Sequence, residues 1–326
     1  MRRIKQAVLA LGVVIAASTA WMPAARAQIT LGISDWPGWV AWYIAEEKGY
    51  FKKYGADVKL VWFPSYIDSV SALSAGQLDA NSQALIDSLA PIEKGVPIKV
   101  VLVTDNSAGN DALMVNNSIK SFADLKGKTL GLEQYSIENY LADTAMARNG
   151  IKPSDVKIVN MSTGDAAAAL ISGRIDAAGV WNPWINRIQN SGKGHPLFTS
   201  KDAPGLIPDI VAARESSLKS KAKDFEGLVK AWYAVVRFVR ENPQAAAEIM
   251  APHVGLDPKE YAQSLAGTRL FGEKLNIEAM QPGSSPVSLF NSTENTGKFL
   301  IQAGAIEKIP DPKAFIDSSF AKQAAK

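Results

Sequence analysis

The chain has 326 residues, of which 47% are hydrophobic and 21% are charged, so it can bury the core of one or two domains and is not intrinsically disordered. The formal net charge is +3, but residues 1–27 hold four of the 35 basic residues and none of the 32 acidic ones, which leaves 31 − 32 = −1 for the rest. Because no cluster of Lys and Arg is interleaved with aromatic residues either, composition gives no reason to expect a nucleic-acid partner.

The first 27 residues have the pattern of a secretory signal. Basic residues within 2–5 precede the apolar run 7–17, and the small-x-small sequence Ala-Arg-Ala follows at 25–27. We therefore predict a signal peptide over 1–27, cleavage before Gln28, and export to the periplasm. The apolar run is shorter than the ~20 residues that span a bilayer. The sequence has no cysteine, so we expect neither a lipoprotein anchor nor a disulfide.

The next stretch alternates apolar runs with loops and helical patterns. The run 30–33 ends in a loop that carries Asp35 and two tryptophans. Apolar spacing then predicts a helix over 40–51 and a second strand over 58–63. Loops that follow the strands of such sheets are where ligands bind, so this loop is the first candidate site.

The region that begins near residue 30 is similar to the region that begins near residue 129. Three patterns recur in the same order at offsets of 99, 98 and 97 residues (129 − 30, 155 − 57 and 169 − 72). The pairs are Thr30-Leu31-Gly32-Ile33 with Thr129-Leu130-Gly131-Leu132, Asp57-Val58-Lys59-Leu60-Val61 with Asp155-Val156-Lys157-Ile158-Val159, and Ala72-Leu73-x-x-Gly76-x-x-Asp79-Ala80 with Ala169-Leu170-x-x-Gly173-x-x-Asp176-Ala177. A repeat this long predicts two similar α/β lobes, each with the order strand, helix, strand, helix, strand.

Two β-rich stretches are candidates for the connections between these lobes. The stretch 98–115 has two β-rich runs around a polar segment, and the run 209–213 is the candidate return crossing. We therefore place lobe I at 28–108 and 213–326, and lobe II at 109–212.

In this order, the motifs resemble one family: the periplasmic solute-binding proteins of the nitrate, sulfonate, taurine and bicarbonate ABC transporters, related to thiamine-pyrimidine-precursor binding proteins. Besides the signal-like start, the resemblance is carried by Tyr50-Phe51-x-x-Tyr54-Gly55, Ala72-Leu73-x-x-Gly76-x-x-Asp79-Ala80, Ser121-x-x-Asp124-Leu125-Lys126-Gly127-Lys128, and Gly173-x-x-Asp176-Ala177 leading to Trp181-x-Pro183. It implies an α/β, type II periplasmic binding protein fold, in which two lobes joined by two crossing segments close on a ligand cleft. It also implies delivery of a small molecule to an inner-membrane ABC permease and its ATPase, and we expect a monomer.

The resemblance places the ligand on the loops after the first strand of each lobe, on the loops after each Gly-x-x-Asp-Ala strand, and at the crossing. In this sequence these loops span 35–39, 81–83, 105–111, 133–136 and 181–184. The candidate ligand-binding residues are Asp35, Trp36, Trp39, Ser82, Asp105, Asp111, Glu133, Tyr135, Ser136 and Trp181.

The five loops carry acidic residues and no Lys or Arg. A binder of anions is expected to line its cleft with basic groups, hydroxyls and free N–H groups, because an unpaired carboxylate there costs affinity. Carboxylates instead favour a cation or a strong hydrogen-bond donor. A planar guanidinium fits best, because carboxylates accept its N–H pairs while an indole covers its face by a cation–π contact. We therefore predict a small, nitrogenous, guanidine-like ligand.

Other interpretations stay open. The same cleft can hold a small anion such as nitrate, bicarbonate or an aliphatic sulfonate, through helix N-termini, amides and hydroxyls such as those of Ser34, Ser82, Ser107 and Ser136. An exported enzyme that acts on a nitrogenous small molecule, and a ligand sensor for a membrane receptor, are two further alternatives. Any single carboxylate can also be structural, as Asp35 is if it caps the following helix.

No motif predicts catalysis or a metal centre. The two histidines, His195 and His253, are far apart in the sequence and have no cysteine or histidine at ligand spacing. The Gly-x-Ser-x-Gly elbow and the complete phosphate-binding loop are absent from the sequence. We therefore expect a binding protein that uses no cofactor and no metal and is not an enzyme.

Overall fold

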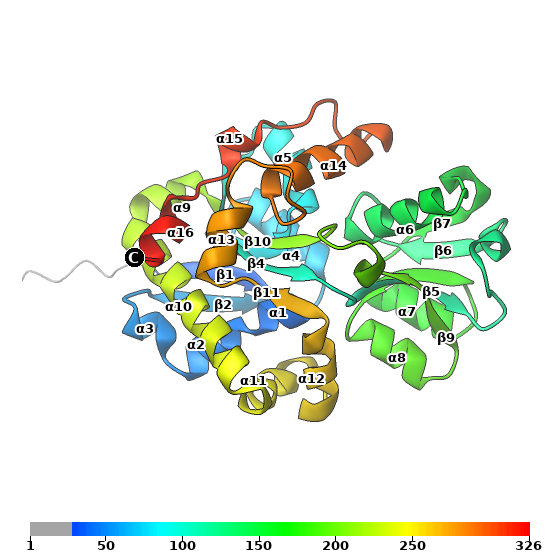
Figure 1. Cartoon of the computed structure of the whole chain (residues 1–326), viewed down its shortest axis with the longest axis horizontal. Coiled ribbons are helices and arrows are strands. Elements are labelled where there is room, and N and C mark those ends of the chain that lie inside the picture. Colours follow the sequence, from blue (N-terminus) through cyan, green and yellow to red (C-terminus); the bar gives the residue numbers. More distant parts are fainter. Residues whose placement is uncertain (1–27) are drawn as a thin grey trace, which may run out of the picture.

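The computed structural model describes residues 28–326, so the predicted signal peptide lies outside the described residues. Two β-sheets lie beside each other, each flanked by helices, and they define two lobes (Figure 1). We call the part with the six-stranded sheet lobe I and the part with the five-stranded sheet lobe II. Within residues 28–326, no helix has both the length and the apolar character that crossing a bilayer requires.

The lobe I sheet has the strand order β11-β4-β10-β3-β1-β2. Its strands are β1 (Ile29–Ile33), β2 (Val58–Trp62), β3 (Ala80–Ala84), β4 (Ile98–Ser107), β10 (Pro208–Arg214) and β11 (Thr268–Leu270). The lobe II sheet has the order β7-β6-β8-β5-β9. Its strands are β5 (Asp111–Asn116), β6 (Thr129–Leu132), β7 (Lys157–Asn160), β8 (Ala177–Trp181) and β9 (Gly194–Thr199).

Strand pairing repeats between the lobes. In lobe I, β1 pairs in parallel with β2 and β3, and β3 pairs antiparallel with β10. In lobe II, β6 pairs in parallel with β7 and β8, and β8 pairs antiparallel with β5. The order β2-β1-β3-β10 therefore has its counterpart in β7-β6-β8-β5, as the sequence repeat predicts.

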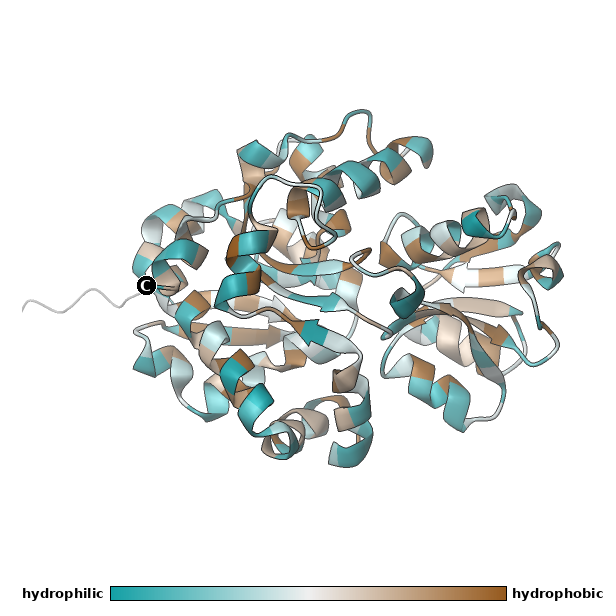
Figure 2. Cartoon of the chain, viewed as in Figure 1, coloured by the Kyte–Doolittle hydropathy of each residue, from teal (hydrophilic) through white to brown (hydrophobic). Residues whose placement is uncertain are grey.

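The helices cover the sheets with their apolar sides. Figure 2 shows hydrophobic and hydrophilic residues in alternating bands along the helices. In the long helix α10, Trp232 and Val235 are fully buried whereas Lys223 and Arg240 are exposed. The helices of lobe II are α6 (Ile137–Arg148), α7 (Thr163–Ile171) and α8 (Trp184–Asn190). Those of lobe I are α1 (Pro37–Val40), α2 (Trp42–Glu47), α3 (Tyr50–Lys53), α4 (Tyr66–Ser74), α5 (Ile86–Glu93), α9 (Glu215–Ser220), α10 (Ala222–Glu241), α11 (Pro243–Met250), α12 (Pro258–Ala266), α13 (Glu273–Ala279), α14 (Leu289–Gln302), α15 (Pro312–Phe315) and α16 (Ser319–Ala324).

The prediction of one helix over 40–51 was wrong. The structure has three short helices there, α1, α2 and α3. Gly49 separates α2 from α3 because its φ of 67° lies in the left-handed region, which a continuing α-helix cannot contain. Pro37 starts α1 at a position where its missing N–H costs nothing.

Two short connections join the lobes. Residues 108–110 link β4 to β5, and residues 200–207 link β9 to β10, beginning with the 3-10 helix η3 (Ser200–Asp202). The run 209–213, which we expected to form the return crossing, lies within β10 and pairs with both β3 and β4. The hydroxyl oxygens of Ser107 and Ser200 are 2.6 Å apart, so the two connections touch where the lobes meet.

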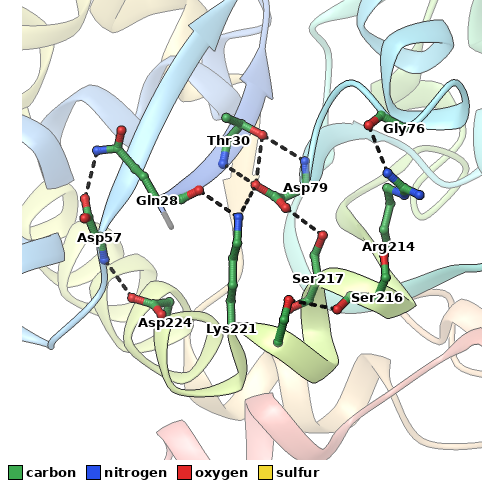
Figure 3. A network of polar contacts seen from close by, with 11 residues as sticks. Gln28, Thr30, Asp57, Gly76, Asp79, Arg214, Ser216, Ser217, Lys221 and Asp224 are labelled. Carbon is green, nitrogen blue, oxygen red and sulfur yellow. Dashed lines mark hydrogen bonds and ion pairs between the residues drawn. The ribbon is translucent and has the colours of Figure 1, made fainter. Parts of the chain in front are cut away.

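The aspartate of the first Gly-x-x-Asp-Ala motif anchors the start of β1 (Figure 3). Oδ2 of Asp79 accepts hydrogen bonds from the backbone N–H of Thr30 at 2.8 Å and from Nζ of Lys221 at 2.8 Å, while Oδ1 accepts from the Ser217 hydroxyl at 2.6 Å. Burial by itself raises the pKa of Asp79, but the hydrogen bonds from Lys221, Ser217 and Thr30 outweigh it and hold this pKa below its usual value.

The second copy of the motif makes the same contact in lobe II. Oδ2 of Asp176 accepts the backbone N–H of Thr129 at 3.0 Å, and Oδ1 accepts from the side-chain amide of Asn116 at 3.2 Å. The motif therefore holds the first strand of each lobe in place, which is a structural role.

Candidate functional site

A narrow cavity with room for about one water molecule lies between the two lobes, and we call it the inner cavity. Both lobes contribute to its walls, lobe I through the loop after β1 and the start of α4, and lobe II through β5, β8 and α6. Its lining residues are Trp36, Trp39, Tyr66, Ala84, Asp111, Ile137, Trp181, Ile207 and Asp209. A cavity of this size admits a ligand of a few heavy atoms only when the lobes move apart.

Aromatic rings form a continuous wall around the inner cavity. The ring centroid of Tyr66 lies 5.0 Å from that of Trp39 and 5.7 Å from that of Trp181, which it meets edge-on. The ring centroids of Trp36 and Trp39 are 6.3 Å apart. Nε1 of Trp39 is buried and has no hydrogen-bond partner. The wall offers aromatic faces, which attract cations, and one free N–H donor.

Two buried carboxyl groups face this wall. Asp111 is the first residue of β5, and Asp209 lies in β10, where strand pairing sets it opposite Asp105. Asp111 and Asp209 are each 2% exposed. The carboxyl group of Asp209 is hydrogen-bonded to that of Asp105, and the carboxyl group of Asp111 to that of Glu138. Burial raises the pKa of Asp111 to about 7, and burial together with the charge of Asp105 raises the pKa of Asp209 well above its usual value. Among the described residues that line the inner cavity, none is Lys or Arg.

Asp105 lies behind the aromatic wall. Its Oδ1 accepts a hydrogen bond from Nε1 of Trp36 at 2.9 Å, which orients this indole. A Cβ atom on Gly38 would stand 2.2 Å from Oδ2 of Asp105, so only glycine allows the two to approach this closely. Burial raises the pKa of Asp105 to about 6.

Two more carboxyl groups surround the inner cavity. The Tyr66 hydroxyl donates to Oδ2 of Asp87 at 2.5 Å, and burial raises the pKa of Asp87 to about 7. Glu138 is fully buried, and its pKa is raised well above the usual value by burial and then by the charges of Asp111 and Glu133. The region is therefore rich in carboxyl groups with raised pKa values, and no Lys or Arg is among the described residues that line the inner cavity.

Asp35 connects the lobes. Its Oδ1 accepts a hydrogen bond from Nε1 of Trp181 at 3.0 Å, and its Oδ2 accepts from Nε1 of Trp184 at 2.9 Å. Trp36, not Asp35, is the N-cap residue of α1. Burial raises the pKa of Asp35, although the two indole N–H groups and the charge of Arg187 act against this. Asp35 therefore holds the lobes together in the closed arrangement.

A second hollow shares Tyr66 and Trp181 with the inner cavity, and we call it the outer chamber. It is partly open to solvent and has a volume of about 390 Å³. Its lining residues are Asp35, Pro64, Ser65, Tyr66, Glu133, Ser162, Thr163, Gly164, Asp165, Ala168, Trp181 and Trp184. Oε1 of Glu133 accepts the backbone N–H of Thr163 at 3.3 Å, and Oε2 has no partner.

The structure brings most of the ten predicted site residues to the boundary between the lobes. Trp36, Trp39, Asp111 and Trp181 line the inner cavity, whereas Asp35, Glu133 and again Trp181 line the outer chamber. Asp105 stands one layer behind, in contact with Trp36.

The other three predicted residues line neither hollow. The Ser82 hydroxyl lies inside lobe I, where it accepts a hydrogen bond from Nε1 of Trp42 at 3.0 Å. The Ser136 hydroxyl donates to the Glu133 carbonyl at 2.8 Å. Tyr135 is 50% exposed and has a φ of 65°. The candidate loops at 35–39 and 133–136 thus bring Asp35 and Glu133 to the outer chamber, whereas Tyr135 stays outside it.

Sequence reasoning missed Tyr66 and Asp209. Tyr66 starts α4 after the Pro-Ser pair at 64–65, a helix start that was readable but carried no sign of a ligand. Asp209 begins the run that we interpreted as a crossing, and only its pairing within β10 directs its carboxyl group to the inner cavity. Within residues 28–326, no group of three or more His, Cys, Asp or Glu side chains is arranged to hold a metal ion.

Two α/β lobes that are joined by two connections and enclose a cavity define the type II periplasmic binding proteins. The alkanesulfonate-binding protein SsuA from Xanthomonas axonopodis pv. citri, solved with bound MOPS, has this fold. It superposes with a TM-score of 0.75 at 17% identity, covering 90% of this chain and 98% of that one, which confirms the predicted fold.

The chain belongs to the NMT1/THI5-like family, whose model matches residues 36–246. A protein of Brucella abortus that is named only as a candidate binding protein is 28% identical over 259 residues, which cover 77% of this chain and 79% of that protein. The taurine-binding periplasmic protein of Escherichia coli is 32% identical over 142 residues, 44% of each chain.

Proposed function

We propose that this protein is the periplasmic solute-binding component of an ABC importer, and that it captures a small guanidine-like cation in the inner cavity. One observation carries the proposal: the buried carboxyl groups of Asp111 and Asp209 face an aromatic cavity that no lysine or arginine lines among the described residues. A buried carboxylate needs a positive partner, and the ligand is the natural source of it. The protein then delivers the unchanged ligand to an inner-membrane permease and its ATPase.

The chemistry of the inner cavity suits a guanidinium. Its N–H groups can donate to Asp111 and Asp209, while Trp36, Trp39 or Trp181 covers its face. Two or three charge-assisted hydrogen bonds at ~1.5–3 kcal/mol each, with a cation–π contact of ~1–2 kcal/mol, reach the ~8 kcal/mol of a micromolar site. Closure of the lobes, held by Asp35, excludes water and strengthens each of these contacts.

Calorimetric titration of residues 28–326 with guanidinium chloride tests the proposal. We expect a micromolar binding event with a stoichiometry of 1:1. Asp111→Asn should weaken this binding at least tenfold, because the variant keeps the shape of the side chain and removes its charge. Glu307→Gln, at an exposed position, removes the same charge far from the cavity and serves as the matched control. Absence of binding by guanidinium, methylguanidinium and amidines would overturn the proposal.

A small anion is the second candidate ligand, and two observations favour it. Nε1 of Trp39 is an unpartnered donor in the inner cavity, and the relatives described above are named for taurine and alkanesulfonate. Asp111 and Asp209 can also donate while they are protonated, as their raised pKa values allow. Tight binding of taurine, nitrate or bicarbonate, with no response to guanidinium, would establish this candidate in place of the cation.

We further propose that the protein binds its ligand without turning it over. Incubation with each bound compound followed by mass spectrometry should return the compound unchanged. A new product in stoichiometric excess over the protein would show an exported enzyme instead.

A further inference from the structure

The outer chamber is acidic and is adjacent to the inner cavity. The two hollows share Tyr66 and Trp181 as lining residues. Asp35 and Glu133 line the outer chamber, and the exposed Asp165 lies at its rim. Among the described residues that line it, none is Lys or Arg. The guanidinium of Arg187 is nearby, but it stacks on the Trp184 ring at 4.3 Å and is not among these lining residues.

Glu133 lacks a partner for one of its oxygens. The residue is 7% exposed, and its Oε1 takes the backbone N–H of Thr163, the first residue of α7. Its Oε2 has no hydrogen-bond partner, and neither has the hydroxyl of Thr163, which is 2% exposed. These two buried oxygen atoms line the same hollow and can accept hydrogen bonds from a ligand. Leaving such atoms unpaired costs free energy, so a ligand with N–H or O–H donors is favoured there.

The surroundings of these atoms favour an organic cation. Tyr66, Trp181 and Trp184 place aromatic rings along the chamber, and such rings attract ammonium and guanidinium groups. A bare metal ion fits less well, because residues 28–326 contain no metal-binding group of three or more His, Cys, Asp or Glu side chains. An anion would face Asp35 and Glu133 with no basic lining residue to offset them.

We propose that the outer chamber is a second binding site for a small organic cation with N–H donors, which the ligand occupies before it enters the inner cavity. This inference rests on the proposed function, since it assigns the same ligand class to both hollows. Glu133 accepts N–H groups of the cation through Oε2, the Thr163 hydroxyl accepts another, and Trp181 or Trp184 covers its face. Movement of the Tyr66 and Trp181 rings as the lobes open then connects the two sites.

Calorimetry with guanidinium chloride over a range from micromolar to tens of millimolar tests the second site. Wild-type protein should show two events, one tight and one at least tenfold weaker. Glu133→Gln should weaken the weak event at least tenfold and affect it more than the tight event, whereas Asp111→Asn should do the reverse. Glu307→Gln is the control for the loss of one charge, and thermal melting of each variant verifies that it is folded.

Each outcome separates the two proposals. A single 1:1 event over the whole range, or a Glu133→Gln variant that weakens both events equally, overturns the second site and leaves the proposed function standing. A weak event that depends on Glu133, with no tight event, overturns the proposed function and supports the outer chamber alone. Two events that respond oppositely to the two variants support both.

Discussion

The pH dependence of ligand binding gives the sharpest test of the ligand's charge. The perturbation is a change from pH 5 to pH 8 at constant ionic strength. Burial raises the pKa of Asp111 to about 7 and that of Asp105 to about 6, so at pH 5 both carboxyl groups hold protons. A cation binds the ionised form, and below pH 7 its binding must release a proton from the cavity.

The magnitude follows from the number of protons released. Release of one proton per ligand makes the affinity rise tenfold per pH unit, which is ~1.4 kcal/mol per unit. The affinity for guanidinium should therefore rise up to about a hundredfold from pH 5 to pH 7, and then level off once Asp111 is ionised. An anion prefers the protonated carboxyl groups, so its affinity should fall over the same range.

Calorimetry in two buffers with different ionisation enthalpies measures both the affinity and the number of protons released. We expect about one proton per guanidinium at pH 6 and fewer at pH 8. Affinity that is constant or falls as the pH rises would refute the reasoning, because it would mean that the ligand does not require ionised carboxyl groups.

The same carboxyl groups affect the stability of the ligand-free protein. Their pKa values are raised in the folded state, so between pH 4 and 7 the folded protein holds protons that the unfolded chain has released, and its stability falls as the pH rises. Asp79 does not change this trend. Its pKa is lowered in the folded state, so its contribution to stability is already complete above the pKa that it has in the unfolded chain. We expect the Tm to fall from pH 5 to pH 8, and saturating guanidinium to reduce this fall. A Tm that rises with pH would contradict the raised pKa values.

Four substitutions complete the predictions. Asp35→Asn removes an acceptor for one of the two indole N–H groups that hold the lobes closed, which costs ~1 kcal/mol. Stopped-flow measurements should therefore show about fivefold faster ligand release. An unchanged release rate would exclude a role of Asp35 in lobe closure. Asp79→Asn breaks a mostly buried ion pair and should lower the free energy of unfolding in urea by about 2 kcal/mol, more than Asp176→Asn, for which we expect ~1 kcal/mol. Gly38→Ala forces a Cβ against Asp105, so guanidinium affinity should fall at least tenfold in a variant that still melts cooperatively.

The two-lobed plan can be read from the amino-acid sequence alone. The repeat at residues 30 and 129 predicted matching lobes, and the structure pairs β1 and β6 in the same way. The two aspartates of the repeated motif have the same structural role in both lobes, since each accepts the first strand's N–H. These features can be predicted because apolar periodicity and turn residues determine secondary structure over short stretches of chain. A pattern that occurs twice in one sequence also indicates two similar units.

The sequence also identified the loop after β1 as part of the candidate site, but not the partners of its side chains. Asp35 could be interpreted as a helix cap until the structure set Trp181 and Trp184 against it, 146 and 149 residues further along the chain. A carboxyl group looks the same in either role, and only the packing of one lobe on the other distinguishes them.

Which polar residues face the ligand cavity depends on how distant parts of the chain pack together. In a strand, a shift of one residue turns a side chain to the opposite face of the sheet, so the position of Asp209 beside the inner cavity depends on the pairing of β10 with β4. Ser82 is directed instead to Trp42 inside lobe I, and Tyr135 is turned to solvent. Tyr66 joins the aromatic wall because α4 packs where the lobes close. Such directions are set by contacts between residues far apart in the chain, and local sequence carries no signal for them.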